Sequence, residues 1–103
     1  MYEKQLDFQA DFLKALAHPA RLQIMEVLRS GEKCVCEIIP ELGLEQSTVS
    51  RHLSVLKREG ILRSRKDGLK VIYWTVNPDI YAIIDRAVEA TRQIWQEKAE
   101  IMS

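Results

Sequence analysis

The chain has 103 residues, of which 47% are hydrophobic and 29% charged, and its 15 Lys/Arg balance 15 Asp/Glu to a formal net charge of zero. This size and composition predict one soluble globular domain with a modest core, and no apolar run is long enough to cross a bilayer. The N-terminus has no charged segment followed by an apolar one, so we expect no secretory signal and a cytoplasmic location.

The first predicted helix covers residues 2–17 and is apolar on two sides. One apolar line contains Leu6, Leu13 and Leu16, and a second contains Phe8, Phe12 and Ala15. A helix of this kind must bury both sides, so we expect one side to meet the core and the other a partner. A fully buried core helix is the alternative, but it is hard to build in so small a domain.

A second helix is predicted over residues 19–29, because Pro19 suits the first helical position. His18 would then be the N-cap, where it is a poor capping residue, and we interpret it as structural. The core face contains Leu22, Ile24, Met25, Val27 and Leu28.

A short third helix is predicted over residues 32–42 and contains Cys34 and Cys36. Pro40 lacks an N–H and removes the donor for the Cys36 carbonyl, so the helix either begins late or is loose around the cysteines. Gly43 can adopt the left-handed conformation that ends a helix.

The fourth helix, predicted over residues 46–59, has one apolar and one polar side. Val49, Leu53 and Leu56 recur at helical spacing, and the opposite side carries hydroxyls, one amide and one guanidinium without a carboxylate. Such groups can donate to phosphates and to base edges in a DNA major groove. The short helix, the turn with Gly and this second helix form a helix-turn-helix pattern; an ordinary amphipathic helix with a solvated polar face is the alternative. With the hairpin described next, the predicted DNA-contacting residues are Gln46, Ser47, Thr48, Ser50, Arg51, His52, Ser54, Arg65, Lys66 and Lys70.

A β-hairpin is predicted next, with strands over residues 62–66 and 69–76 and Asp67-Gly68 as the turn. This register places Arg65 opposite Lys70, a pair of like charges that is unfavourable unless an anion such as phosphate lies between them. A solvated hairpin edge kept soluble by charge is the alternative. Residues 51–70 carry seven Lys/Arg and two Asp/Glu, whereas the rest of the chain carries eight and 13. One basic end can therefore be steered to DNA, with binding that depends steeply on salt.

The last predicted helix begins after Asn77 as N-cap and Pro78 as first residue. Its apolar stripe runs over four turns, more than the remaining chain can cover. With the first helix it predicts a homodimer. The predicted interface residues are Leu6, Leu13, Ile84, Val88, Thr91 and Trp95.

Over nearly its whole length, the chain resembles the ArsR/SmtB family of winged helix-turn-helix metal-responsive repressors. The resemblance is carried by LAHPARLQIMEVL, CVC, QSTVSRHLSVLKREGIL and RKDGLKVIYW. It implies a mostly α fold with a small β-hairpin wing, and a dimeric repressor that leaves its operator when an effector binds. The arsenic-sensing branch uses thiolates in the helix that holds CVC here. A third cysteine of that branch falls at Ile39, the last helix has no His for the family's zinc-type site, and His18 replaces the usual Asp.

Cys34 and Cys36 are the candidate effector ligands. In a regular helix their side chains diverge by about 200°, so they can meet only if Cys34 precedes the first turn or the helix unwinds. Soft thiolates suit As(III), Sb(III) or other thiophilic ions as effector, with no cofactor required. Two half-buried structural cysteines are the alternative.

The favoured function is a DNA-binding repressor that senses a thiophilic metalloid, closest to the arsenic-sensing branch, with double-stranded operator DNA as partner. A redox or sulfur-species sensor using the same thiols is the second hypothesis. Three further alternatives are a winged-helix regulator without a metal effector, a winged-helix protein-binding module and a CVC thiol oxidoreductase. No Ser/His/Asp set, phosphate loop or paired carboxylate site supports another enzyme, so we predict that the chain is not an enzyme.

Overall fold

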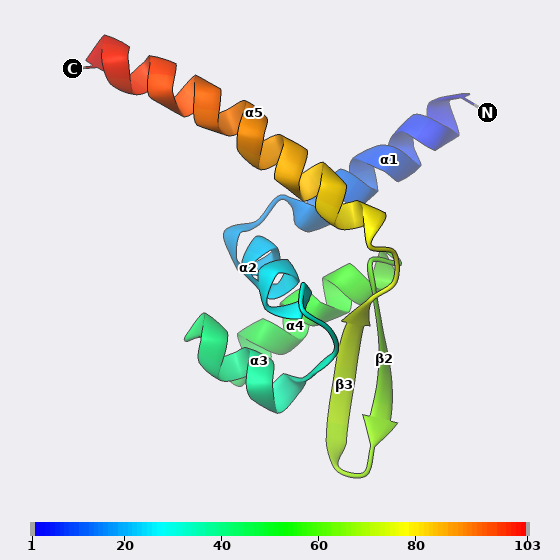
Figure 1. Ribbon diagram of the computed structural model, residues 1–103. Coiled ribbons are helices and arrows are strands. Elements are labelled where there is room, and N and C mark those ends of the chain that lie inside the picture. The colour runs from blue at the N-terminus through cyan, green and yellow to red at the C-terminus, as the bar shows by residue number, and fades with distance from the viewer. Residues whose placement is uncertain (1, 103) are drawn as a thin grey trace.

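The computed structural model of the protein describes residues 2–102. Its five helices and three strands are, in chain order, α1 (Tyr2–Leu16), α2 (Pro19–Leu28), β1 (Lys33–Cys34), α3 (Val35–Leu42), α4 (Gln46–Arg58), β2 (Leu62–Asp67), β3 (Lys70–Thr75) and α5 (Asp79–Met102). Figure 1 shows α2, α3 and α4 as a central body, with α1 and α5 crossing on one side of it and the β2–β3 hairpin projecting from another. The described helices include none that is both long and apolar enough to span a membrane.

The core lies between α2, α3, α4 and the first turns of α5. The apolar stripe predicted for the fourth helix is buried: Val49, Leu53 and Leu56 each have at most 1% of their surface exposed. Burial of such side chains contributes roughly 1.5–3 kcal/mol each, so this stripe fixes the side of α4 that faces inward. The polar side of α4 is thereby directed away from the core.

The predicted helix ends are confirmed to within one residue for the first, second and fourth helices. His18 does cap α2, since its Nδ1 accepts the Ala20 N–H at 3.0 Å. Gly43 ends α3 in the left-handed conformation, with φ of 67°. The third helix differs from the prediction because it begins at Val35 rather than at residue 32. Of the two possibilities raised by Pro40, the late start is the observed one.

The residues before α3 form a strand that the sequence analysis did not predict. Lys33 pairs with Tyr73 and Cys34 with Ile72, so β1 adds a third antiparallel strand to the hairpin in the order β1-β3-β2. A two-residue strand has no periodicity of its own, and its pairing partner is about 40 residues away in sequence. The consequence is that Cys34 belongs to the sheet and not to the helix.

The hairpin register also corrects the prediction. Asp67 pairs with Lys70, and Arg65 pairs with Ile72, so Arg65 and Lys70 are not opposite each other. The two turn residues are therefore Gly68 and Leu69. Gly68 has φ of 64°, whereas no described non-glycine residue has positive φ. One positive φ at the first turn position is the pattern of a type II′ turn, whereas an Asp-Gly type I′ turn needs two.

The start of α5 is held against the body by polar contacts. The Tyr81 hydroxyl donates to the Met25 carbonyl at 2.8 Å and lies 2.8 Å from the Thr75 hydroxyl. Arg29 binds Asp85 at 2.8 Å. As predicted, Asn77 caps the helix by accepting the Asp79 N–H. The root of α5 is thus tied to α2 and β3.

Candidate nucleic-acid interface and cysteine pair

The exposed face of α4 carries most of the side chains predicted to contact DNA. Gln46, Ser47, Ser50, Arg51 and Ser54 are all exposed, whereas Thr48 is half-buried. No ion pair joins Arg51 to another residue within 2–102. A polar helix face with one uncommitted guanidinium is the arrangement that inserts into a major groove and donates to base edges.

His52, also predicted to contact DNA, faces the body of the protein instead. Its ring lies 4.4 Å from the ring of His18, and Arg21 Nη1 lies 3.3 Å from its Nδ1. An arginine can only donate, so His52 Nδ1 accepts and the ring is neutral in this contact. Burial lowers the pKa of His52, and its electrostatic interactions with His18, Arg21 and Arg51 lower it further. His52 therefore joins α4 to α2.

The wing, defined as β2, β3 and their turn, extends beside α4 and carries Lys66 and Lys70 on its exposed surface. Neither lysine forms an ion pair with a residue between 2 and 102. Arg65 differs, because its Nη1 and Nη2 bind the two carboxylate oxygens of Glu32 at 2.7 and 2.8 Å. Its guanidinium also lies 5.5 Å from the centroid of the Trp74 ring. The anion that binds Arg65 is therefore the carboxylate of Glu32 in the same chain.

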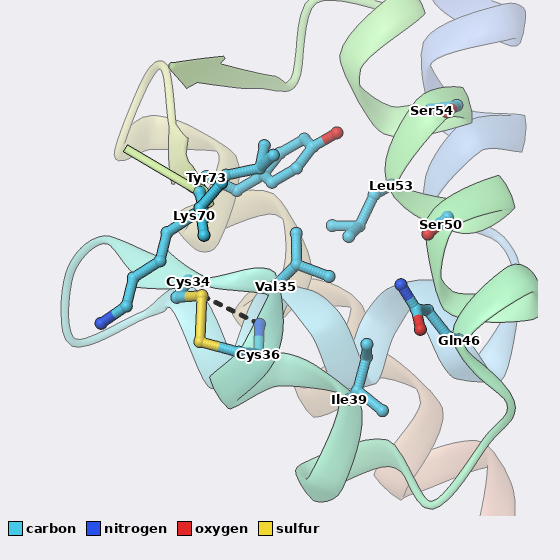
Figure 2. Close-up of a pocket in the computed structure, with 12 residues that line it drawn as sticks. Cys34, Val35, Cys36, Ile39, Gln46, Ser50, Leu53, Ser54, Lys70 and Tyr73 are labelled. Atoms are coloured by element: carbon cyan, nitrogen blue, oxygen red, sulfur yellow. Dashed lines mark hydrogen bonds between the residues drawn. A yellow bond between two sulfur atoms is a disulfide. The ribbon is translucent and has the colours of Figure 1, made fainter. Parts of the chain in front are cut away.

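The two cysteines meet because Cys34 lies outside the helix. Its backbone is extended, with φ of −69° and ψ of 147°, and it occupies the N-cap of α3. From there its Sγ accepts the Cys36 N–H at 3.0 Å and is disulfide-bonded to Cys36, with Cα atoms 5.0 Å apart (Figure 2). The divergence expected of two residues in one regular helix therefore does not apply.

Glu37 completes the cap, and the sequence analysis missed its role. Its Oε1 accepts the Cys34 N–H at 3.0 Å while Cys34 Sγ occupies the place of the usual hydroxyl. This is a capping box, in which the N-cap and the third helical residue satisfy each other's neighbouring amides. The spacing Cys-x-x-Glu was the available signal, hidden because Cys replaces the usual Ser or Thr.

The disulfide lies on a cavity between α3, α4 and the wing. Its volume is about 430 Å³, and its walls include both cysteines, the polar residues Gln46, Ser50 and Ser54 of α4, and Lys70 of the wing. Figure 2 shows Gln46 and Ser50 on α4 across this space from the disulfide, with Lys70 and Tyr73 on the wing side. The candidate effector residues and part of the candidate DNA interface therefore border the same space.

The donor set limits what the cysteines can bind. Among residues 2–102 no cluster of three or more His, Cys, Asp or Glu is placed to hold a metal ion. After reduction the pair would supply two soft thiolate ligands, which suit thiophilic ions. No third His, Cys, Asp or Glu among residues 2–102 is placed to complete a metal site with them.

A second, apolar cavity of about 390 Å³ lies between α1, α2 and α5. It is lined by Leu13, Leu16, Ala17, Leu22, Ile83, Ile84, Ala87, Val88 and Thr91. Val88 is 49% exposed and Leu13 52%, and Leu6 and Trp95 are also exposed, whereas Ile84 is only 6% exposed and packs in the core. Ile84 is thus mainly a core residue, whereas the other apolar residues of the predicted interface are exposed. The Thr91 hydroxyl donates to the Ala87 carbonyl at 2.8 Å.

Comparison with known proteins agrees with this arrangement. Residues 18–64 match the model of the bacterial regulatory protein, arsR family. Over 95 residues the chain is 35% identical to the uncharacterized HTH-type transcriptional regulator Rv0081 of Mycobacterium tuberculosis, covering 91% of this chain and 83% of that protein. The chain belongs to the arsR family. The resemblance found in the sequence is therefore confirmed, and with it the winged helix-turn-helix fold of a transcriptional regulator.

The chain is also similar to two further bacterial proteins. The Arsenical resistance operon repressor of Escherichia coli is 35% identical over 88 residues, which cover 84% of this chain and 74% of that protein. The homodimeric winged helix-turn-helix DNA-binding domain Mb0332 of Mycobacterium bovis superposes with a TM-score of 0.81 at 28% identity, covering 93% of this chain and 89% of that chain. The crystal structure of Rv0081 superposes with a TM-score of 0.82, covering 92% and 96%.

Proposed function

We propose that this arsR-family regulator is a homodimeric, DNA-binding transcriptional repressor whose affinity for its operator is set by the Cys34–Cys36 pair. The observation that carries the proposal is the shared cavity: the disulfide opens onto the same space as Gln46, Ser50 and Lys70. A chemical change at the sulfurs therefore acts beside the groups that would contact DNA.

The DNA-binding part rests on the exposed face of α4 and on the wing lysines. Arg51 can reach base edges from α4, whereas Lys66 and Lys70 can hold phosphates at either side of a groove. Two such units are needed to match two half-sites, about 34 Å apart. The exposed apolar residues of α1 and α5, including Leu13 and Val88, supply a surface for the second copy. We expect the protein to act in the cytoplasm, where its DNA partner lies.

The effector part rests on the position of Cys34. It belongs to β1, which pairs with the wing, and at the same time it caps α3, which precedes α4 by three residues. Closing or opening the sulfur–sulfur bond changes the geometry at this junction. We expect the reduced protein to bind the operator and the oxidised protein to bind it less tightly. Oxidation can have this effect only if it favours the DNA-free form of the protein over the DNA-bound form.

A second candidate effector is a thiophilic ion such as As(III) or Sb(III), bound by the reduced pair. Two observations favour it: the two Cα atoms are only 5.0 Å apart, and one relative of 35% identity is an arsenical resistance operon repressor. The ion would hold the two sulfurs farther apart than a disulfide does, so both effectors act on the same junction.

The test begins by selecting the preferred duplex from a random DNA library with the reduced protein. Binding of that duplex is then measured by fluorescence anisotropy with reduced protein, oxidised protein and reduced protein plus arsenite, antimonite, cadmium or zinc. We expect specific binding by the reduced form and release by oxidation or by a thiophilic ion. Absence of any sequence preference would overturn the DNA-binding part, and equal affinity under all conditions would overturn the effector part.

A further inference from the structure

The two cysteine residues of the disulfide differ in exposure. Cys34 is only 4% exposed, because it lies in the sheet against the core, whereas Cys36 is exposed at the surface of α3. A nucleophile arriving from solvent therefore meets the sulfur of Cys36. This asymmetry determines which of the two possible products thiol–disulfide exchange would give.

Cys34 is placed to be the leaving group of such a reaction. Its Sγ accepts the Cys36 N–H at 3.0 Å and lies at the N-terminus of α3, where the helix dipole stabilises negative charge. The Glu37 carboxylate, which accepts the Cys34 N–H at 3.0 Å, is a negative charge that acts against this stabilisation. A stabilised leaving thiolate speeds exchange, so attack at Cys36 is favoured both by access and by the product it releases.

The cavity beside the disulfide has room for the incoming molecule. Its volume of about 430 Å³ is within the usual range of small-molecule sites, roughly 300–1,000 Å³. Lys70 contributes a positive charge to its wall, and Gln46 and Ser50 contribute hydrogen-bonding groups. These walls suit a polar thiol that carries negative charge.

We propose that the oxidised protein takes up a small anionic thiol at Cys36. The thiolate R–S⁻ attacks Cys36 Sγ, the R–S–S–Cys36 bond forms, the Cys34–Cys36 bond breaks, and Cys34 leaves as a thiolate. A second R–S⁻ then releases R–S–S–R and leaves both cysteines reduced. The proposal rests on the proposed function in one respect: the adduct would occupy the space between α4 and the wing and block DNA.

The first experiment detects the adduct without DNA. Oxidised full-length protein is mixed with glutathione, quenched with acid at short times, alkylated and digested. Mass spectrometry of the peptide spanning residues 34–51 then locates the adduct. We expect glutathione on Cys36 and the alkyl group on Cys34. Glutathione on Cys34, or equal amounts on both, would overturn the proposal.

Two single variants make the test independent of the lifetime of the adduct. Cys34→Ser keeps a good N-cap and leaves Cys36 free, so oxidised glutathione should form a stable adduct there. Cys36→Ser leaves only the buried Cys34, which should react at least tenfold more slowly. Comparable rates in the two variants, with folding verified by circular dichroism, would contradict the assigned asymmetry.

Lys70 tests the charge of the ligand. Lys70→Gln should slow adduct formation with glutathione by about fivefold at low salt, the effect of one nearby charge in water. It should leave the rate with cysteamine unchanged, because the ammonium group of cysteamine cancels the charge of its reactive thiolate. Lys66→Gln removes an equal charge from the same wing but from a residue that does not line the cavity. An equal effect of both substitutions would overturn the role of Lys70.

The DNA measurement separates this inference from the proposed function. The Cys34→Ser protein with glutathione attached should bind the selected duplex at least tenfold more weakly than the same protein reduced. If reduced wild type fails to bind any duplex while the adduct forms on Cys36, the proposed function fails and the chemistry stands. If the duplex is bound equally with and without the adduct, the blocking role is overturned.

Discussion

Glu32 and Arg65 form a bidentate ion pair, with N–O distances of 2.7 and 2.8 Å, that joins the residue next to β1 to strand β2 of the wing. The hydrogen bonds from Arg65 lower the pKa of Glu32, and the same bonds raise the pKa of Arg65. Both side chains are about half exposed, so the pair contributes little to stability. Its larger effect is to occupy a guanidinium that would otherwise be available to a phosphate.

Replacing Glu32 with Gln should therefore strengthen DNA binding. The substitution frees Arg65 and removes one negative charge near the wing, so we expect a several-fold lower Kd at low salt and a salt slope steeper by about one. Anisotropy titrations over a range of salt concentrations measure both quantities. Glu41→Gln, on the exposed surface of α3, is the matched control for charge. Equal gains in the two variants would contradict a specific release of Arg65.

The dimer should depend on the exposed apolar residues of α1 and α5. Leu13→Glu with Val88→Glu places two charges on the surface proposed for the second copy, and we expect a folded monomer in sedimentation experiments with severely weakened DNA binding. Ile84 is unsuitable for this test because it belongs to the core, and a charge there would unfold the chain. Leu69→Glu, at the exposed wing tip, should leave the mass unchanged. A dimer of unchanged stability in the double variant would refute the interface.

The α4 face and the wing should affect DNA binding in different ways. Arg51→Ala should reduce the preference for the selected duplex over other sequences, because a good base contact is worth about 1–3 kcal/mol of discrimination. Lys66→Ala should weaken binding to all duplexes alike and lower the salt slope by about one. Competition titrations with unrelated DNA distinguish the two outcomes. The assignment fails if the wing variant changes sequence choice and the α4 variant does not.

The contact between His52 and Arg21 should make the fold sensitive to acid. The pKa of His52 is lowered in the folded state by burial first and by His18, Arg21 and Arg51 next, so the unfolded chain binds its proton more readily. His52 therefore contributes stability that is fully present above about pH 6.5 and is lost as the pH falls through the lowered value. Urea unfolding from pH 8 to pH 5 measures this loss.

His52→Gln should flatten that part of the pH profile. The carboxyl groups of Glu26, Glu32 and Asp85 also titrate differently in the folded state, but their arginine partners lower their pKa values, so their effect appears at lower pH. An unchanged slope between pH 6.5 and 5 in the variant would show that His52 is not the responsible group.

The helices could be predicted from sequence because their signals are local. Val49, Leu53 and Leu56 mark the buried side of α4 by spacing alone, and Gly43 marks the end of α3 by its conformation. The partners of Arg65 and Cys34 are set by strand pairing instead. The choice between Asp67-Gly68 and Gly68-Leu69 as the turn shifts every cross-strand neighbour, and β1 is too short to show a pattern. The register of the hairpin and the long-range pairing of β1 with β3 together determine the ion pair and the position of the disulfide.

The last prediction concerns the cysteine pair as a whole. Cys34→Ser/Cys36→Ser should keep the capping box, because Ser is a good N-cap and Glu37 can still accept the amide at residue 34. We therefore expect the double variant to fold, to dimerise and to bind the selected duplex with the affinity of reduced wild type.

The same variant should not respond to thiol-directed effectors. Oxidant, arsenite or antimonite should release reduced wild type from the duplex and leave the double variant bound, since both cysteine sulfurs of this junction have been removed. The measurement is an anisotropy titration of each effector against preformed complex, with a zinc titration as a comparison. A variant released by arsenite or antimonite as readily as wild type would place the sensing site away from Cys34 and Cys36. A wild type that no oxidant or thiophilic ion releases would remove the sensing role and leave a DNA-binding protein whose disulfide is structural.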